Sequence, residues 1–239
     1  MSRRFSFCGM TSRYLQHFSH LFYPHVCEGC GSDVVRHEQL LCSRCMHRLP
    51  YTGYPDITGN PVEKLFYGRC RLESAAAIFY FSKHSLMQHL LLQLKYHGNR
   101  EAGYFLGRMM GRAMADSGRF DGVELLVPLP LNPKKEFIRG YNQAMIICTG
   151  IADTWPRPIA AAMVERVKFT ETQTRKDRLG RWQNMQNVFH ATDEHLLQGR
   201  HVLLVDDVIT TGATLEACGN ALLEVPGLKL SVAAAAYTT

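Results

Sequence analysis

Residues 202–214 read VLLVDDVITTGAT, and this stretch decides the fold more than any other part of the chain. Its first four residues are apolar and predict a buried strand that ends at two acids, Asp206 and Asp207. A polar turn follows, and apolar residues then recur at helical spacing over 215–225. A strand, a polar turn and a helix in this order are typical of an α/β protein.

The turn over residues 210–214 predicts a phosphate site. Gly212 lets the chain bend without a Cβ clash, so that successive backbone N–H groups face one point beside the start of a helix. With a 5′-phosphate at that point, Asp206 and Asp207 would stand near the 2′ and 3′ hydroxyls of a ribose. The stretch therefore predicts a sugar phosphate site. The residues expected to hold the phosphate are Thr210, Thr211, Gly212, Ala213 and Thr214.

Other sites of similar composition fit this stretch less well. A Walker A loop needs a lysine after its last glycine, and a dinucleotide fingerprint needs three spaced glycines, whereas this turn has one glycine and no lysine. Two adjacent acids could bind a metal, as in a response regulator, but that leaves the threonine-rich turn unexplained. A plain helix N-cap beside chance acids is the remaining alternative.

The rest of the chain alternates predicted strands and helices. Strands are expected over 75–81, 124–129, 160–167 and 232–237, and helices over 86–94, 105–113 and 141–153. Residues 133–135 are expected to open a loop. The alternation predicts a mostly parallel sheet covered by helices on both faces, with ligands bound at the carboxyl ends of its strands.

Four of the eight cysteines form two Cys-x-x-Cys pairs separated by eleven residues, Cys27 with Cys30 and Cys42 with Cys45. This spacing is typical of a closed, structural zinc site with four thiolate ligands. His25, His37 and His47 are near enough in the sequence to replace a ligand. Two disulfides and a redox-active dithiol are the alternatives, and the absence of an export signal argues against the first.

Composition and charge set further limits. The chain has 239 residues, 46% of them hydrophobic and 20% charged, which argues for a globular protein with its own core. No apolar run approaches the roughly 20 residues of a membrane helix, so we expect a cytoplasmic protein without membrane insertion. The net charge is +6, and most of the excess basic residues lie between 61 and 188. Such a basic region suits a polyanion, although a solvated basic surface is the plainer interpretation.

Several motifs, read in order, resemble one known family. Residues 205–214 are similar to the phosphoribosyl pyrophosphate (PRPP) motif of type I phosphoribosyltransferases. Further matches resemble the ComF family of competence-associated proteins, and they cover most of residues 75–239. These matches are LKYHG at 94–98, VPLP at 127–130, RGYNQ at 139–143, and Thr172-Gln173 followed by Asn184 and Phe189. Tyr141 stands where many relatives have phenylalanine, and Gln183 where many have a charged residue.

The resemblance implies a type I phosphoribosyltransferase fold, a mostly parallel sheet flanked by helices, with a small N-terminal zinc module held by four cysteines. It divides the chain into residues 1–60, with the module and a linker, and residues 61–239, the phosphoribosyltransferase-like domain. It also implies that Zn²⁺ is structural and that Mg²⁺ accompanies PRPP.

The same resemblance implies roles for single residues. Asp206 and Asp207 would hold the ribose hydroxyls, and Lys134, Lys135 and Arg139 would supply cations to a pyrophosphate loop. Asp206, Asp207 and Arg139 are the residues expected to act in catalysis. Residues 168–181 would form a hood that closes over the site, with Gln173, Arg175, Lys176, Arg178 and Arg181 as its candidate residues. A solvated basic face remains the alternative for Arg139 and the hood cations.

Two functions of different classes follow. The first is a phosphoribosyltransferase that moves the phosphoribosyl group of PRPP to an unknown acceptor and releases pyrophosphate, in a protein associated with DNA uptake. The second is a non-catalytic protein of competence that binds single-stranded DNA or serves as an adaptor of the uptake machinery, with the PRPP fold as its scaffold. The sequence alone leaves the acceptor and the oligomeric state open.

Overall fold

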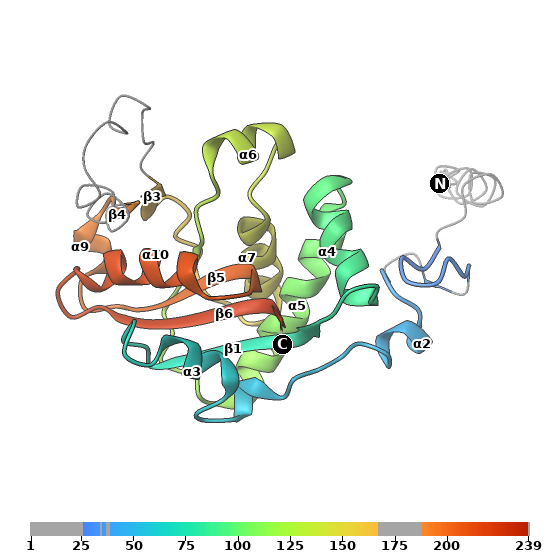
Figure 1. The fold of residues 1–239 in the computed structure, drawn as a ribbon, viewed down its shortest axis with the longest axis horizontal. Helices are drawn as coiled ribbons and strands as arrows, with labels where there is room; N and C mark the ends of the chain where they lie inside the picture. Colours follow the sequence, from blue (N-terminus) through green and yellow to red (C-terminus); the bar gives the residue numbers. More distant parts are fainter. Residues whose placement is uncertain (1–25, 34, 37–38, 167–187, 239) are drawn as a thin grey trace, which may run out of the picture. The chain divides into compact units, whose positions relative to one another are not determined.

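The computed structural model describes residues 26–33, 35–36, 39–166 and 188–238, and it divides the chain into two compact units (Figure 1). The first unit ends at Arg48 and the second begins at Leu49. Within the described part of the first unit, a turn over Cys27–Gly31 precedes the short helix α2 (Ser43–Met46). The functional division of the chain at residue 60 stays a prediction.

A four-stranded sheet forms the centre of the second unit. Its strands are β1 (Ser74–Phe81), β6 (Lys229–Thr238), β5 (His201–Ile209) and β2 (Leu125–Pro128), in this order, and all neighbours are parallel. The predicted parallel sheet is therefore confirmed. Both central strands, β5 and β6, are buried over most of their length, as expected of strands covered on both faces.

Helices cover both faces of this sheet (Figure 1). On one face lie α4 (Leu86–Tyr96), α5 (Arg100–Ser117) and α7 (Gln143–Thr154). The other face carries α3 (Pro61–Phe66) and α10 (Ala213–Leu223). Among the described residues, the shorter elements are η1 (Tyr54–Asp56), α6 (Pro133–Arg139), α9 (Glu194–Leu197), and the antiparallel pair β3 (Val164–Arg166) and β4 (Phe189–Ala191).

Helices α5 and α7 approach each other closely because glycines line their contact. A Cβ atom on Gly107 would lie 2.1 Å from the carbonyl oxygen of Ile147, and one on Gly150 would lie 2.2 Å from that of Tyr104. Gly111, one turn further on, also faces α7, whereas Gly103, one turn before, faces Leu94 of α4 as well as Ile146 of α7. Only residues without a Cβ allow this spacing, so the glycines fix how α7 packs behind the sheet.

Three expectations need correction. Strand β5 continues past Asp206 and Asp207 to Ile209, because Val208 and Ile209 still pair with β6. Residues 133–135 begin the helix α6, with Asn132 as its N-cap and Pro133 in the first turn, where proline is well tolerated. The strand expected over 160–167 is only Val164–Arg166, and it pairs with β4 outside the main sheet.

The segment before α3 is held to the sheet by buried polar contacts. Asn60 caps α3, and its Nδ2 donates to the carbonyl oxygen of Ala75 at 2.8 Å. Arg119 reaches the carbonyl oxygen of Ile57 at 2.9 Å and pairs with Glu63. Residues that the sequence identified only as a linker therefore pack on the second unit. No helix in the described part of the chain is both long and apolar enough to cross a bilayer.

Candidate functional site

The two acids of β5 lie on different sides of the strand. Successive side chains of a strand point to opposite faces of the sheet, and β5 remains a strand through both acids. Asp206 lines a small cavity with the turn over 210–214, whereas Asp207 lines a larger one beside α4. The site is therefore built around the end of one strand, with one carboxylate on each side.

Asp206 is held in surroundings that disfavour its charge. Its Oδ1 accepts a hydrogen bond of 2.8 Å from the backbone N–H of Asp207. Burial, together with the nearby carboxylate of Asp207, raises the pKa of Asp206 to about 7. A charged Asp206 therefore lowers the free energy of unfolding of the protein.

Asp207 is paired with a lysine that the sequence analysis gave no role. The Nζ of Lys95, on the last turn of α4, lies 2.7 Å from Oδ1 of Asp207, and both side chains are largely buried. An ion pair in such surroundings is screened less by solvent than one at the surface. Lys95 belongs to the LKYHG motif, so the motif was the available signal for this residue.

The turn after β5 has the shape of an anion site. Gly212 adopts a left-handed conformation, with a φ of +73°, and its Cα faces the ring of Phe66 from α3. Helix α10 begins at the next residue, so its first backbone N–H groups have no intrahelical acceptor. The turn and Asp206 line a depression of about 40 Å³. The residues expected to hold a 5′-phosphate are thus brought to one place.

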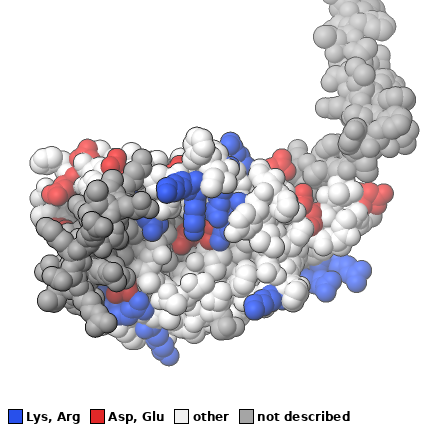
Figure 2. Space-filling view, turned by 45° about the horizontal axis from the view of Figure 1, so that its top comes forward, with Lys and Arg blue, Asp and Glu red and all other residues white. Residues whose placement is uncertain are grey.

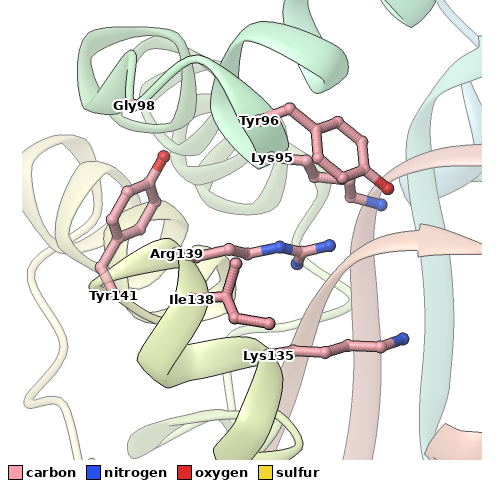
Figure 3. Close-up of a pocket in the computed structure, with 7 residues that line it drawn as sticks. All are labelled: Lys95, Tyr96, Gly98, Lys135, Ile138, Arg139 and Tyr141. Atoms are coloured by element: carbon pink, nitrogen blue, oxygen red, sulfur yellow. The ribbon is translucent and has the colours of Figure 1, made fainter.

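A second part of the site lies between α4 and α6. A cavity of about 320 Å³ is lined by Lys95, Lys135 and Arg139, with Tyr96, Gly98, Ile138 and Tyr141 around them. Figure 3 shows the charged ends of the two lysines and the arginine pointing in the same direction. Figure 2 shows basic side chains gathered beside acidic ones on this face of the molecule. Three cations directed at one space suit a polyanion.

Contacts from α7 and α4 hold Arg139 in place. Its Nη1 donates to Oε1 of the buried Gln143 at 2.7 Å, and its guanidinium lies 5.3 Å from the ring centre of Tyr96. The Nε2 of Gln143 is buried and has no hydrogen-bond partner among the described residues. Asn142 caps α7 and donates to the carbonyl oxygen of Leu129. The Arg-Gly-Tyr-Asn-Gln motif therefore fixes both the arginine and the start of α7.

Not every predicted site residue joins this arrangement. Lys134 is exposed on α6 and does not line the cavity that Lys135 and Arg139 share. The hood residues Gln173, Arg175, Lys176, Arg178 and Arg181 lie outside the described residues. Phe137 and Ile138 on α6 are 90% and 81% exposed, so this helix presents apolar side chains as well as cations.

The four paired cysteines form one cluster in the first unit. Their sulfur atoms all lie within 4.8 Å of one another, and Sγ of Cys30 lies 3.7 Å from Sγ of Cys42. A tetrahedral zinc site with Zn–S bonds of about 2.3 Å requires sulfur atoms about 3.8 Å apart. None of the four forms a disulfide. The cluster therefore fits a structural Zn²⁺.

Hydrogen bonds from backbone N–H groups favour the thiolate form of Cys27, which is the form that binds a metal cation. Burial opposes ionisation of Cys27, but hydrogen bonds from the N–H groups of Cys42 and Gly29 outweigh it and lower its pKa to about 6. Burial and the other sulfur atoms raise the pKa of Cys45 to about 12. Thiols crowded in this way ionise together only when a metal neutralises their charge.

We expect purified protein to carry one zinc per chain, and we expect the variant Cys30→Ser to lose the zinc. Residues 27–48 should then unfold first, because so small a unit has little core of its own. Metal analysis after a chelator wash measures the zinc, and limited proteolysis reports the unfolding. Cys70→Ser, outside the cluster, is the matched control and should keep the metal. A zinc-free protein that remains folded, or disulfides between the two pairs, would contradict the assignment.

Asp206→Asn is expected to stabilise the protein in a pH-dependent way. The folded carboxyl has a pKa of about 7 against 3.8 normally, so the folded state binds more protons between these values and stability falls as the pH rises through them. Asparagine removes this cost. The gain should grow from pH 4 to pH 7 and reach about 2–4 kcal/mol at pH 8.

Urea unfolding without ligand or metal at pH 5 and pH 8 measures this gain. Asp116→Asn, at an exposed position of α5, should change stability by less than about 0.5 kcal/mol at either pH. A gain for Asp206→Asn that is equal at both values would contradict the burial of a charge at this position.

Comparison with known proteins identifies relatives over most of the chain. A model of the phosphoribosyl transferase domain matches residues 154–237, which include β5, α10 and most of β6. Competence protein F of Haemophilus influenzae is 30% identical over 197 residues, which are 81% of this chain and 76% of that protein. The DNA utilization protein YhgH of Salmonella typhimurium is 28% identical over 201 residues, 83% of this chain and 78% of its own length.

Solved structures are similar at lower coverage. One of them is the glutamine PRPP amidotransferase of B. subtilis in complex with ADP and GMP, with a TM-score of 0.42 and 16% sequence identity. The match covers 59% of this chain and 30% of the other.

Proposed function

The chain belongs to the competence protein F (ComF) family of proteins with a phosphoribosyltransferase domain, and from this premise we propose that it binds PRPP with Mg²⁺ and transfers the phosphoribosyl group to an acceptor. Pyrophosphate is the second product. The observation that carries the proposal is the convergence of three groups at the end of β5: an anion nest, two carboxylates and a set of three cations.

Each part of the site suits one part of PRPP. The turn over 210–214 and the start of α10 hold the 5′-phosphate, because they line one depression and the first N–H groups of α10 have no intrahelical acceptor. Asp206 and Asp207 accept hydrogen bonds from the ribose hydroxyls. Lys135, Arg139 and Lys95 hold the pyrophosphate, and the buried Gln143 positions Arg139 through its Oε1.

The same charges assist the transfer step. As the bond from the anomeric carbon to pyrophosphate breaks, positive charge grows on the sugar and negative charge on the departing oxygen. The carboxylates stabilise the first and the cations of α4 and α6 the second. Carboxylate oxygens are ligands that Mg²⁺ prefers, so Asp206 or Asp207, one on each side of β5, would hold the ion, and Mg²⁺ would supply charge neutralisation of the pyrophosphate.

Residues outside the described part of the chain complete the proposal. The role assigned to Gln173 and the cations at 175–181, to keep water from the reacting sugar, stays a prediction because these residues lie outside the described ones. In this proposal the zinc module is structural and the protein acts in the cytoplasm.

The proposal is tested with PRPP and Mg²⁺ by calorimetry, followed by a screen for pyrophosphate release with a panel of amines, nucleobases and nucleic acids. We expect binding at micromolar PRPP and release that depends on one class of acceptor. Arg139→Ala should abolish release while Lys134→Ala, on the same helix but outside the cavity, should not. A wild-type protein that does not bind PRPP would overturn the proposal.

A second candidate function is the handling of single-stranded DNA. It is supported by the names of the relatives, which refer to competence and to DNA utilization, and by the cations of α6 beside the exposed Phe137. Aromatic side chains among cations can stack bases and hold phosphates. In this case the PRPP fold would serve as a scaffold for an adaptor of DNA uptake.

Salt dependence separates the two candidates. If Lys134 and Lys135 contact DNA phosphates, replacing both by alanine should lower the slope of log K against log[salt] by about 0.7 for each lost contact. If the site serves PRPP, DNA affinity should stay nearly constant in Lys135→Ala while pyrophosphate release falls. A reduced slope with intact release would favour the DNA function.

A further inference from the structure

The turn over 210–214 is supported by a segment that has no role in the function proposed above. This segment, residues 66–70, includes the last residue of α3 and the turn that follows it. The buried ring of Phe66 lies against Gly212, with ring atoms 3.1 and 3.2 Å from where a Cβ would be. The backbone N–H of Arg69 donates to the carbonyl oxygen of Phe66 at 2.9 Å, which fixes the shape of the segment. Neither side chain lines the depression formed by the phosphate turn.

The guanidinium of Arg69 joins this segment to the phosphate turn and to α10. Its Nη1 donates to the carbonyl oxygen of Thr211 at 3.2 Å and to that of Leu65 at 2.9 Å. Its Nη2 pairs with the carboxylate of Glu216, in the first turn of α10. Asn220, further along α10, donates through Nδ2 to the carbonyl oxygen of Arg69 at 3.2 Å. Arg69 is therefore connected both to the turn and to the helix that follows it.

The contact with Thr211 determines the direction of one peptide group. A trans peptide is planar, so the carbonyl oxygen of Thr211 and the N–H of Gly212 point in opposite directions, and the described residues contain no cis peptide bond. Because the oxygen is directed at Arg69, the N–H is directed away from Arg69. This N–H has no acceptor among the described residues. It can therefore donate to an anion in the depression that Gly212 lines.

The backbone could also adopt the opposite orientation of this peptide. Glycine adopts positive and negative φ with similar ease, so Gly212 by itself does little to prevent a rotation of the peptide before it. After such a rotation the carbonyl oxygen of Thr211 would replace the N–H and repel a phosphate. The rotation would break the charge-assisted hydrogen bond from Arg69, so Arg69 favours the orientation that binds an anion.

The ion pair with Glu216 has a second effect on an anionic ligand. A carboxylate in the first turn of a helix suits the helix dipole, but it repels a phosphate bound at the same helix end. Arg69 compensates this charge. The side chains of the pair are 39% and 27% exposed, so the pair itself should add little to the stability of the fold.

We propose that Arg69 is a positioning residue for the 5′-phosphate, which keeps the N–H of Gly212 directed at the phosphate by holding the carbonyl oxygen of Thr211. It acts through the turn and does not touch the ligand. This inference rests on the proposed function and adds a residue outside the motifs together with the way in which it acts. The pyrophosphate end of the site, at Lys135 and Arg139, is outside its influence.

Calorimetry with ribose 5-phosphate and with pyrophosphate and Mg²⁺ tests the proposal on the full chain. Arg69→Met should weaken ribose 5-phosphate by about tenfold, as expected for the loss of one charge-assisted hydrogen bond, and change pyrophosphate affinity by less than about twofold. A general loosening of the fold would weaken both ligands. Arg71→Met, at an exposed position two residues further on and outside the depression, is the matched control and should keep both affinities.

NMR of the backbone amides reports the direction of the peptide itself. The probe is inorganic phosphate. In the wild-type protein the Gly212 amide proton should shift downfield as phosphate is added, because the N–H gains a charged acceptor. In Arg69→Met this shift should be largely lost. The amide of Gly227, outside the depression, should not move in either protein.

A double variant separates orientation from charge compensation. Glu216→Gln alone should not weaken ribose 5-phosphate, because Arg69 still holds the carbonyl oxygen of Thr211. Arg69→Met combined with Glu216→Gln should stay about as weak as Arg69→Met, because the oxygen still lacks its donor.

Each outcome bears on one claim. A wild-type protein that binds neither PRPP nor ribose 5-phosphate would overturn the proposed function. If the wild-type protein binds both, an unchanged ribose 5-phosphate affinity in Arg69→Met, or an equal loss of pyrophosphate, would overturn the positioning role alone. Recovery of affinity in the double variant would show that Arg69 only neutralises Glu216, and would overturn the role in orienting the peptide.

Discussion

Replacing Asp206 and Asp207 together by asparagine is expected to weaken PRPP binding by about 10²- to 10⁴-fold. Each carboxylate is proposed to accept charge-assisted hydrogen bonds from sugar hydroxyls, worth roughly 1.5–3 kcal/mol, which is about ten- to a hundredfold. Asp207→Asn also leaves Lys95 without its 2.7 Å partner. Calorimetry with PRPP and Mg²⁺ gives the affinity directly.

A control with the same chemistry is available at the surface. Asp116→Asn with Asp121→Asn removes two charges at exposed positions outside the cavities that Asp206 and Asp207 line, and should leave the affinity unchanged. The single variants separate the two acids, which lie on opposite sides of the strand. Unchanged affinity in the double variant of β5 would remove both acids from the PRPP site.

Gly107→Ala is expected to destabilise the protein by more than about 3 kcal/mol. The added methyl group would lie 2.1 Å from the carbonyl oxygen of Ile147, which is backbone and cannot rotate away. Helices α5 and α7 would have to separate, and α7 carries Gln143, which holds Arg139. Overpacking of this kind typically costs 1–3 kcal/mol, and backbone contact places this position at the upper end or beyond it.

The matched control is Gly103→Ala on the same helix. Its added methyl group would meet the ends of the Leu94 and Ile146 side chains, at 2.6 and 2.9 Å, and side-chain ends can shift. Urea unfolding should therefore show a clearly smaller loss for Gly103→Ala. Equal losses would mean that backbone contact between the two helices does not determine their spacing.

The central features of the fold were predictable because they depend on local patterns. Apolar runs and helical spacing predict β1, β5, β6 and the helices between them. The parallel direction of the strands is confirmed, whereas the order of the strands in the sheet was not predicted. The clustering of the four cysteines was also predictable, since two tight turns at zinc spacing leave few other arrangements. The family was recognised from motifs in order along the chain, and the relatives confirm it.

The features that the sequence does not predict depend on contacts between segments far apart in the chain. Lys95 lies more than a hundred residues from Asp207 in the sequence, and no local pattern joins them. The glycines of α5 recur at every fourth residue, a signal that was present but could not show that α7 was their partner. The polar residues after Pro133 favour a loop when only composition is considered, although Asn132 and the proline are a good helix start.

The extension of β5 past its acids restricts how this protein can change. Because neighbouring side chains of a strand alternate, inserting or deleting one residue between His201 and Asp206 would exchange the surroundings of the two acids. Asp207 would then face the phosphate turn, and Lys95 would lose its carboxylate. Hydrogen bonds to β2 and β6 on either side prevent the strand from absorbing such a shift. New specificity at this site must therefore arise by substitution, and length changes are confined to the turn before His201 or to segments beyond Thr214.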